Sequence, residues 1–491
     1  MNKDQISNDD SEGRKPEAHS SLPIPNSPLP TPHSELRTAL QRVAWRIVPF
    51  ICLLYVLNIL DRANVGFARL AMQDDLGLTK AMFDLGYGMF YVGYILFEVP
   101  SNLLMRRFGA RRWIARIMIT WGLVSAATMF AQDVWTFYSL RILLGIAEAG
   151  FFPGIILYLS DWFPDRQRAK MTAFFMLAIG LSNVLGNPLS GWIMDNFDGV
   201  NGWHGWQWLF LLEGLPTSLV GITVLFYLQD SPRDAKWLSD SQRQSLIEHL
   251  AEEDRQRQAQ HGPDRWQAML QPRVWLLIAI YFTVAVGSNA GGAYFPTLIK
   301  EQFQQVTNFQ IGLLTALPHL CAIVVMSLVG ISSDRTGERR WHLTGSALLA
   351  AVGWSLVAWG PSPVVALVGL CLAQSGMMSM LPVFWTLPGV FLSGVAAAGG
   401  IALINSVANI GGFFGASILG QLGLWSMAAI LMFGGLLAAS VLRNWSPKRT
   451  RSNAHDICAS ALPSVLIQPE VDSIDSKAGA LMEEGKDDGN V

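Results

Sequence analysis

Four charged side chains lie inside apolar stretches of this sequence. Asp61 and Arg62 stand in YVLNILDRANVGFA, and Arg141 and Glu148 stand in SLRILLGIAEAGFFPG. A charge at the centre of a membrane helix costs roughly 2.5–3.5 kcal/mol on insertion scales, so such residues persist where they pair, line water or handle ions and substrate. Two acids and two bases in such positions indicate a pathway for a proton and an anion.

The side-chain types predict a division of roles within this set. A guanidinium matches both oxygens of a carboxylate, so Arg62 and Arg141 are predicted to bind an anionic substrate. Asp61 and Glu148 are predicted to carry the proton, because a carboxylate that loses a neighbouring cation binds a proton more readily. Anion and proton would then bind cooperatively. In the alternative, the four charges form buried ion pairs that only fix two helices, and Arg62 anchors near the outer interface.

The elements that must position these residues are membrane helices. The chain has 491 residues, of which 51% are apolar and 15% charged, which is typical of a membrane protein that crosses the bilayer many times. A crossing needs roughly 20 apolar residues. About twelve segments meet this length, at 46–67, 82–105, 112–131, 135–159, 170–194, 206–228, 274–299, 309–332, 341–359, 364–388, 396–421 and 423–442.

Depth along these helices brings the charges together. Asp61 lies about fourteen residues along the first segment, or roughly 21 Å at 1.5 Å per residue. Arg141 lies about six residues into the fourth, roughly 9 Å from the opposite face, so the two depths coincide in a core about 30 Å thick. Glu148 follows Arg141 by about two turns and projects from the same side. We therefore expect both helices to present these charges to one cavity.

Basic residues predict the orientation. They cluster in alternate loops, whereas 195–205 and 360–363 contain no Lys or Arg. The positive-inside rule then places both termini in the cytoplasm, with the chain in the plasma membrane, or the inner membrane of a bacterium. The basic clusters are Arg106, Arg107, Arg111 and Arg112, then Arg166, Arg168 and Lys170, then Arg335, Arg339 and Arg340.

The domain organisation follows from composition. Residues 1–44 and 446–491 are polar tails that we expect to be disordered. Two six-helix bundles are predicted at 45–228 and 273–445. The linker at 229–272 is predicted to be cytoplasmic and to contain a helix along the membrane surface, with Leu238, Leu246, Ile247 and Leu250 on one face.

The two halves repeat each other at one place. RRFGARR at 106–112 and GISSDRTGERR at 330–340 both follow an even-numbered crossing and supply a tight turn, at Gly109 and at Gly337. This indicates internal duplication. Gating is assigned to these two glycines and to three charged residues of the second loop, where Asp334 can pair with Arg335, Arg339 or a helix end.

Seven motifs are spread over the apolar part of the chain. They are NILDRAN at 58–64, EVPSNLLMRRFGARRWIARIMITWG at 98–122, RILLGIAEAGFFPG at 141–154, WLFLLEGLP at 208–216, SDRTGERR at 333–340, LPVFWTLP at 381–388 and GIALINSVANIGGFFG at 400–415. Together they resemble the major facilitator superfamily, and within it the anion:cation symporter family that includes bacterial carriers of tartrate, phthalate and galactonate. The resemblance covers about 45–445 and implies an all-α fold of two pseudo-symmetric six-helix bundles, a central cavity, alternating access and proton-driven uptake of an organic anion.

Further substrate contacts are predicted with less specific signals. Tyr87 and Tyr91 belong to an aromatic stripe that either contacts substrate or packs. The resemblance places contacts from the second half at Asn289, Trp385 and Thr386. Asn405 and Asn409 share a helix face and need a partner, either substrate or a neighbouring helix. Structural roles are expected for Glu98, Glu213 and His319, and the family's usual acid in the first inner loop is replaced here by Arg106.

Enzyme functions are excluded by the motifs the sequence lacks. It has no phosphate-binding glycine loop, no His-Glu-x-x-His and no Gly-x-Ser-x-Gly, so we expect no catalysis, cofactor or metal. A gradient must then drive the carrier. The expected partners are a small organic anion, protons and membrane lipid, with no nucleic acid, and one polypeptide is expected to suffice. The alternatives are a facilitated carboxylate exchanger or uniporter, and a membrane sensor that does not transport.

Overall fold

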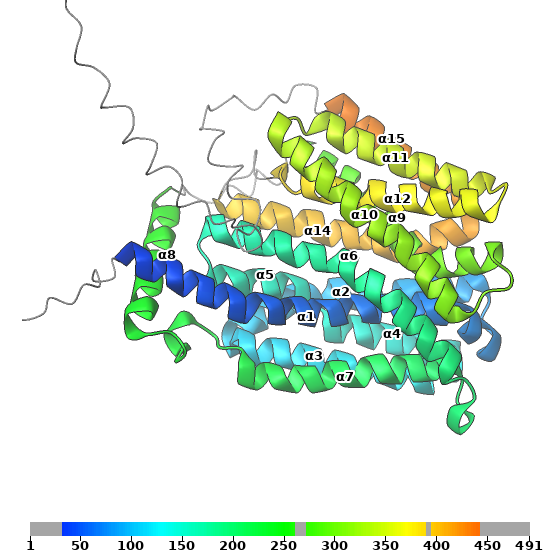
Figure 1. Cartoon of the computed structure of the whole chain (residues 1–491), viewed down its shortest axis with the longest axis horizontal. Helices are drawn as coiled ribbons and strands as arrows, with labels where there is room; N and C mark the ends of the chain where they lie inside the picture. The colour runs from blue at the N-terminus through cyan, green and yellow to red at the C-terminus, as the bar shows by residue number, and fades with distance from the viewer. Residues whose placement is uncertain (1–31, 261–271, 389–393, 442–491) are drawn as a thin grey trace, which may run out of the picture. The chain divides into compact units, whose positions relative to one another are not determined.

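The computed structural model describes residues 32–260, 272–388 and 394–441, and their regular structure is entirely helical (Figure 1). Each predicted crossing coincides with one helix, except that 135–159 coincides with the pair α4 and α5. The helices are α1 Pro32–Asp75, α2 Lys80–Phe108, α3 Ala110–Ala127, α4 Val134–Glu148, α5 Phe151–Trp162, α6 Asp165–Asn196, α7 Gly205–Tyr227, α8 Asp240–Gln260, α9 Pro272–Gln302, α10 Asn308–Thr336, α11 Arg340–Trp359, α12 Pro363–Phe384, α14 Gly394–Leu422 and α15 Leu424–Val441.

Among the described residues, nine helical stretches are long and apolar enough to cross a membrane. The predicted crossings in α2, α6 and α15 are helical but are not among those nine. The all-α membrane fold is therefore confirmed, while the count of twelve crossings stays a prediction.

The first helix begins earlier than the sequence predicted. It starts at Pro32, so residues 32–44 are helical and the predicted disordered tail was too long. Ala39 and Val43 are fully buried, one turn apart, because this part of α1 packs against α8. The Arg42 guanidinium also donates to Gln242 Oε1 at 3.1 Å. Residues 1–31 and the predicted tail at 446–491 lie outside the described part of the chain.

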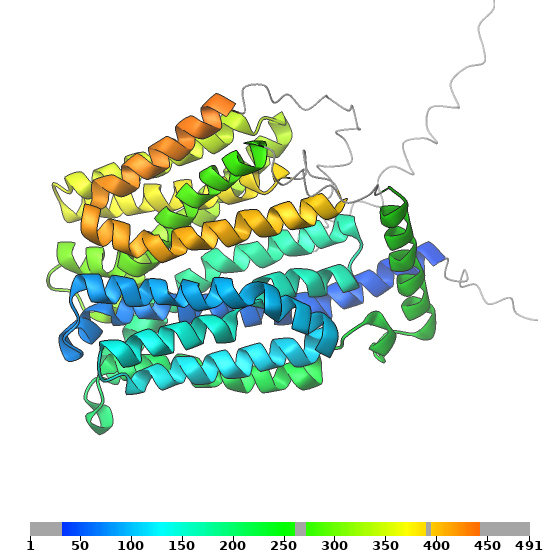
Figure 2. The same cartoon turned by 180° about the vertical axis from the view of Figure 1, so that it is seen from behind.

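The helices form two groups that correspond to the two halves of the sequence. In the first half α3 packs against α7 and α2 against α4, and in the second half α11 packs against α12 and α15. Three pairs join the halves: α1 with α9, α2 with α14, and α6 with α10. Figures 1 and 2 show these six helices between α3 and α7 on one side and α11 and α15 on the other. A surface between the halves is thus built by α1, α2, α6, α9, α10 and α14.

The linker forms the predicted helix. In Figure 1, α8 runs across the ends of other helices beside the start of α1. Leu246 on α8 is fully buried, and Leu238 just before it is nearly so. The apolar face of α8 is therefore covered at least in part by protein, and its predicted position on the membrane surface stays a prediction.

Both predicted glycine turns are present. Gly109 has φ +89° between α2 and α3, and Gly337 has φ +68° at the end of α10. Each turn meets an acid: Asp230 accepts the N–H of Arg111 at 2.8 Å, and Asp334 lies 2.7 Å from the Arg339 guanidinium. In the first loop, Arg106 stands where the resemblance expects an acid. An acid from the segment after α7, Asp230, contacts this loop instead.

The fourth crossing is broken directly after Glu148. Ala149 leaves helical geometry and Gly150 adopts φ +84°, so α4 ends at Glu148 and α5 begins at Phe151. Pro153 explains the break, because a proline ring collides with the carbonyl group four residues earlier in a continuous helix, here that of Ala149. Glu148 is thus the last residue of a half-helix in the interior of the protein.

Candidate substrate site

A central pocket of about 180 Å³ lies between the two halves. Each half contributes three helices: α1, α2 and α6 from the first, and α9, α10 and α12 from the second. Its polar lining includes one cation and several neutral hydrogen-bonding groups. These are Arg62, Tyr87, Tyr91, Asn183 and Asn187 from the first half, and Asn289, Thr315, His319 and Gln374 from the second.

Arg62 and Glu148 form an ion pair at the edge of this pocket. Arg62 Nη2 lies 2.5 Å from Glu148 Oε1, and Arg62 Nε donates to the same oxygen at 2.7 Å. Asn58, one turn before Arg62, donates its amide to that oxygen at 2.7 Å. The Arg62 side chain is 30% exposed and that of Glu148 is 0% exposed. Arg62 alone of this pair lines the pocket, and Glu148 lies behind it.

Asp61 faces the interior of the first half. Its carboxylate accepts the indole N–H of Trp121 at 2.9 Å and the hydroxyl hydrogen of Ser125, both on α3. Asn64 donates at 3.3 Å from the next turn of α1. Asp61 is buried and does not line the central pocket. Adjacent residues on a helix point about 100° apart, which is why Arg62 reaches the pocket and Asp61 does not.

Arg141 lies under the aromatic side chains of α2. Its guanidinium carbon is 5.1 Å from the Phe90 ring centre and 5.6 Å from that of Tyr87, at distances typical of cation–π contacts. Arg141 is buried, and its Nε has no hydrogen-bond partner among the described residues. Tyr87 lines the pocket and Arg141 does not, so of the four predicted charges only Arg62 lines the central pocket.

Tyr91 and Asn289 connect the halves beside the pocket. The Tyr91 hydroxyl donates to Asn289 Oδ1, and the Asn289 amide donates to the Ala285 carbonyl at 2.8 Å. On the same pocket wall, the amide nitrogen of Asn187 is buried and lacks a partner among the described residues. The lining of the pocket therefore includes a hydrogen-bond donor that has no partner among the described residues.

The second half contributes neutral groups to the pocket. His319 Nδ1 and Gln374 Nε2 lie 3.2 Å apart, and both side chains are almost fully buried. His319 also lines a neighbouring inner pocket of about 570 Å³ that extends to Asp334 and Arg339. Because Ile179, His319 and Met378 line both pockets, the central pocket leads toward the predicted cytoplasmic end.

The remaining predicted contacts lie outside the central pocket. Trp385 and Thr386 line the inner pocket, where Trp385 packs edge-on against Tyr281 with ring centres 5.1 Å apart. Asn405 donates to Glu98 Oε1 at 3.1 Å and so joins α14 to α2. Asn409, one turn on, is half-buried.

Two buried charged residues outside the central pocket were missed by the sequence analysis. Arg69 on α1 and Asp84 on α2 form an ion pair in which each side chain is 1% exposed. They lie near helix ends, where charged residues commonly reach the membrane surface, so their position gave no reason to expect burial. The available signal was the two-turn spacing from Arg62 to Arg69, which places both on one side of α1.

Comparison with known proteins defines the class. The profile of the Major Facilitator Superfamily matches residues 51–416, and the chain belongs to this superfamily. Among solved structures, the xylose transporter XylE from E. coli, in a partially occluded inward open conformation, aligns with a TM-score of 0.66. The two chains are 16% identical over 83% of this chain and 98% of XylE. A bacterial homologue of the lysosomal transporter Spinster aligns with a TM-score of 0.64 and 17% identity over 80% of this chain and 95% of the homologue. Both show the fold alone.

Sequence relatives are more similar. A protein of Agrobacterium vitis named "Putative tartrate transporter" is 46% identical over 83% of this chain and 92% of its own length. A protein of Pseudomonas putida named "Putative metabolite transport protein NicT" is 45% identical over 82% of this chain and 92% of its own length. A protein of Acinetobacter baumannii named "Quinolone resistance transporter" is 38% identical over 85% of this chain and 98% of its own length. The chain is thus a membrane transporter of this superfamily and not an enzyme.

Proposed function

We propose that this protein is a secondary active transporter that moves a small organic anion together with protons by alternating access. The substrate class is a carboxylate such as tartrate, phthalate or a sugar acid, in keeping with the relatives named for tartrate. The observation that carries the proposal is the Arg62–Glu148 pair, in which the exposed cation faces the pocket and the acid is buried behind it.

The coupling follows from competition for one cation. A substrate carboxylate that binds Arg62 replaces Glu148 as its partner, because both need the same guanidinium nitrogens. Glu148 then keeps the amide of Asn58 but loses its counter-charge. A buried carboxylate without a cation binds a proton more readily. Anion and proton therefore favour each other's binding, and by linkage the effect is reciprocal.

The far side of the pocket supports a hydroxylated substrate. Asn289, His319 and Gln374 line the pocket with hydrogen-bonding groups, and none of the three is an acid or an arginine. Such groups suit hydroxyl or carbonyl oxygens at the end of the substrate away from Arg62. A hydroxy-carboxylate satisfies both sides, because its carboxylate matches the arginine and its hydroxyls match the amides.

Uptake by proteoliposomes tests the proposal. Purified protein is reconstituted, and accumulation of labelled tartrate is measured with an alkaline interior and with no pH gradient. Exchange is measured separately with tartrate on both sides. The Glu148→Gln variant is expected to keep exchange and lose accumulation driven by the gradient, since glutamine cannot carry the proton. Glu252→Gln, at an exposed position on α8, is the matched control.

The outcomes separate the alternatives. Full accumulation by Glu148→Gln would contradict the role given to Glu148. Exchange without gradient-driven accumulation by the unaltered protein would favour a facilitated exchanger. Binding of tartrate with neither exchange nor accumulation would favour a sensor. Because tartrate is one member of the class, phthalate and galactonate are measured in parallel.

A further inference from the structure

Three buried side chains join the two halves away from the central pocket. Arg69 lies on α1, Asp84 on α2 and Tyr294 on α9. They lie toward the outer end, defined here as the end with the α1–α2 and α9–α10 connections, which the arginine distribution predicts to face away from the cytoplasm. None of the three lines the central or the inner pocket.

The three groups contact one another in a closed triangle. Arg69 Nη1 lies 2.8 Å from Asp84 Oδ1, Arg69 Nη2 donates to the Tyr294 hydroxyl at 2.8 Å, and that hydroxyl donates to Asp84 Oδ2 at 2.8 Å. The Arg69 guanidinium carbon is also 3.8 Å from the Tyr294 ring centre. Arg69 and Asp84 are 1% exposed and Tyr294 is 8% exposed. The triangle is thus shielded from water.

A glycine of the second half closes the space beside the triangle. A methyl group at Gly420 on α14 would collide with both Asp84 Oδ2 and the Tyr294 hydroxyl. The backbones of α1 and α9 also approach closely, since a methyl group at Gly66 would collide with the carbonyl oxygen of Gly292. The halves are therefore in direct contact around the triangle.

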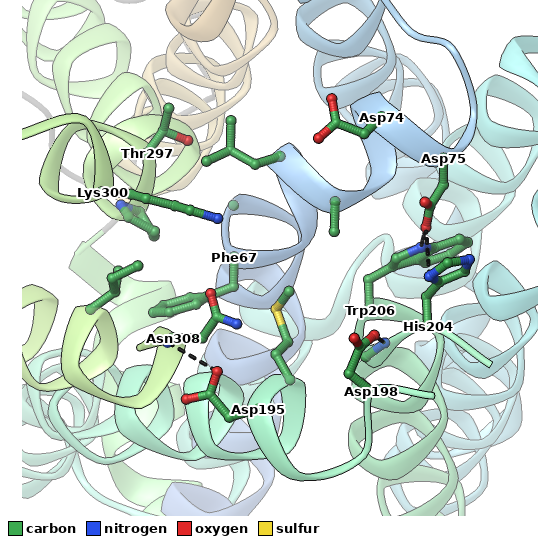
Figure 3. Close-up of a pocket in the computed structure, with 17 residues that line it drawn as sticks. Phe67, Asp74, Asp75, Asp195, Asp198, His204, Trp206, Thr297, Lys300 and Asn308 are labelled. Carbon is green, nitrogen blue, oxygen red and sulfur yellow. Dashed lines mark hydrogen bonds and ion pairs between the residues drawn. The ribbon is translucent and has the colours of Figure 1, made fainter. Parts of the chain in front are cut away.

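A second polar contact closes the outer end between α6 and α10. Asp195 accepts the N–H groups of Asn308 and Phe309 at 3.0 and 2.7 Å. Figure 3 shows Asp195 directed toward Asn308 at the wall of an outer pocket of about 370 Å³. Of the residues that line this pocket, Pro296 also lines the central pocket. The outer halves of the two bundles are thus held together while the central pocket leads inward.

When the outer ends separate during alternating access, the members of the triangle move with different halves. Arg69 and Asp84 both belong to the first half, so their ion pair persists when the outer ends separate. Tyr294 and Gly420 belong to the second half and move away. The two hydrogen bonds of the Tyr294 hydroxyl are therefore made only when the outer end is closed. Interactions made in one state alone are those that shift a conformational equilibrium.

We propose that Tyr294 is the latch of the outer gate, which holds the two halves closed by binding the Arg69–Asp84 ion pair. This inference rests on the alternating-access function proposed above. Tyr294 is a positioning residue in this scheme: it sets the proportion of outward-open protein and does not contact the substrate. Gly420 is required because its position allows the latch to close.

Distance measurements between spin labels test the latch. The labels are placed on the full chain through Gln132→Cys and Gln304→Cys, at positions that are both exposed at the outer end of opposite halves, after replacement of the native cysteines by serine. Tyr294→Phe keeps the ring and removes the hydroxyl. Gly420→Ala keeps all three polar groups and adds one methyl group. Pulsed electron resonance then gives the distance distribution without substrate.

Both variants are expected to add a longer distance and to raise the ratio of open to closed protein about tenfold, as loss of hydrogen bonds to charged groups predicts. Two matched controls should leave the distribution unchanged. Tyr227→Phe removes a hydroxyl bond to Arg46 within the first half, and Gly345→Ala adds a methyl group where nothing lies within 4 Å.

An unchanged distribution in Tyr294→Phe and Gly420→Ala would overturn the latch. A shift of equal size in Tyr227→Phe would also overturn it, because the effect would then not depend on a contact between halves. Folding is checked by gel filtration of each labelled protein. The measurement needs neither substrate nor protons, so a failure of proton coupling would leave this result interpretable.

Discussion

The carboxylate of Glu148 lies 2.5 Å from the guanidinium of Arg62, and the central pocket reaches only the guanidinium. In the proposed mechanism, a substrate anion must displace the Glu148 carboxylate from Arg62 before it binds with full strength. This competition lowers the affinity for the anion when Glu148 is charged, and the loss disappears when Glu148 is protonated. Proton coupling in this proposal thus needs no direct contact between the proton site and the substrate.

The fork geometry of Arg62 predicts the effect of lysine at this position. Arg62→Lys keeps one positive charge but cannot bind two carboxylate oxygens through one planar group. Hydrogen bonds to charged groups contribute about 1.5–3 kcal/mol, so the KM for tartrate uptake should rise roughly tenfold or more. Concentration-dependent uptake measures this. Arg233→Lys in the exposed linker is the control, and an unchanged KM in Arg62→Lys would remove Arg62 from the binding site.

Asp61 is predicted to be a second proton-binding group even though it faces α3. Asp61→Asn should keep tartrate exchange and reduce accumulation driven by the pH gradient at least tenfold. The reason is that asparagine cannot bind the proton that Asp61 is proposed to carry. Ser125→Ala removes one donor to Asp61 but keeps the carboxyl group, so it should retain accumulation. Proton uptake is followed with a pH-sensitive dye. Equal losses in both variants would assign Asp61 a structural role.

Gln374 is predicted to select substrates with hydroxyl groups. Gln374→Met has similar volume and removes the amide that neighbours His319. Loss of a hydrogen bond to substrate is expected to cost about 1–2 kcal/mol, or roughly tenfold in preference. The ratio of tartrate to succinate uptake tests this, since succinate lacks the two hydroxyls. A ratio equal to that of the unaltered protein would place the hydroxyl-binding groups elsewhere.

Gly109 is predicted to be required for stability at the α2–α3 turn. Its φ of +89° is disfavoured for other residues, and a Cβ there would lie 2.8 Å from Asp230 Oδ1. Gly109→Ala should lower the free energy of unfolding by about 1–3 kcal/mol. Thermal unfolding in detergent measures it. Gly345→Ala, which meets no atoms within 4 Å, should show no loss, and equal midpoints for the two variants would contradict the strain at Gly109.

The apolar segments and glycine turns were predictable because each depends on nearby residues alone. Segment length gave the helices, and the repeated loop gave the turns at Gly109 and Gly337. The similar depth of the charges on α1 and α4 followed from the rise per residue, and Arg62 and Glu148 do form an ion pair between these helices. The direction of Asp61 toward α3 did not follow, because depth carries no information on which neighbour a helix face meets.

The contacts between halves were beyond the sequence analysis for a related reason. Tyr294 lies more than two hundred residues from Asp84 along the chain, and no spacing rule connects them. Arg69 and Asp84 were not among the predicted site residues, and only the structure shows that they form a buried ion pair. The start of α1 at Pro32 was missed because its apolar face is covered by α8, which belongs to the linker and not to a membrane segment.

The break between α4 and α5 has a consequence for how force passes through this crossing. A continuous helix transmits rotation at one end to the other, whereas a step at Ala149 and Gly150 lets the two half-helices tilt separately. Glu148 is the last residue of α4, so tilting of α5, toward the predicted cytoplasmic end, need not separate its carboxyl group from Arg62. The break at Ala149 and Gly150 therefore separates the position of Glu148 at the end of α4 from movements of α5.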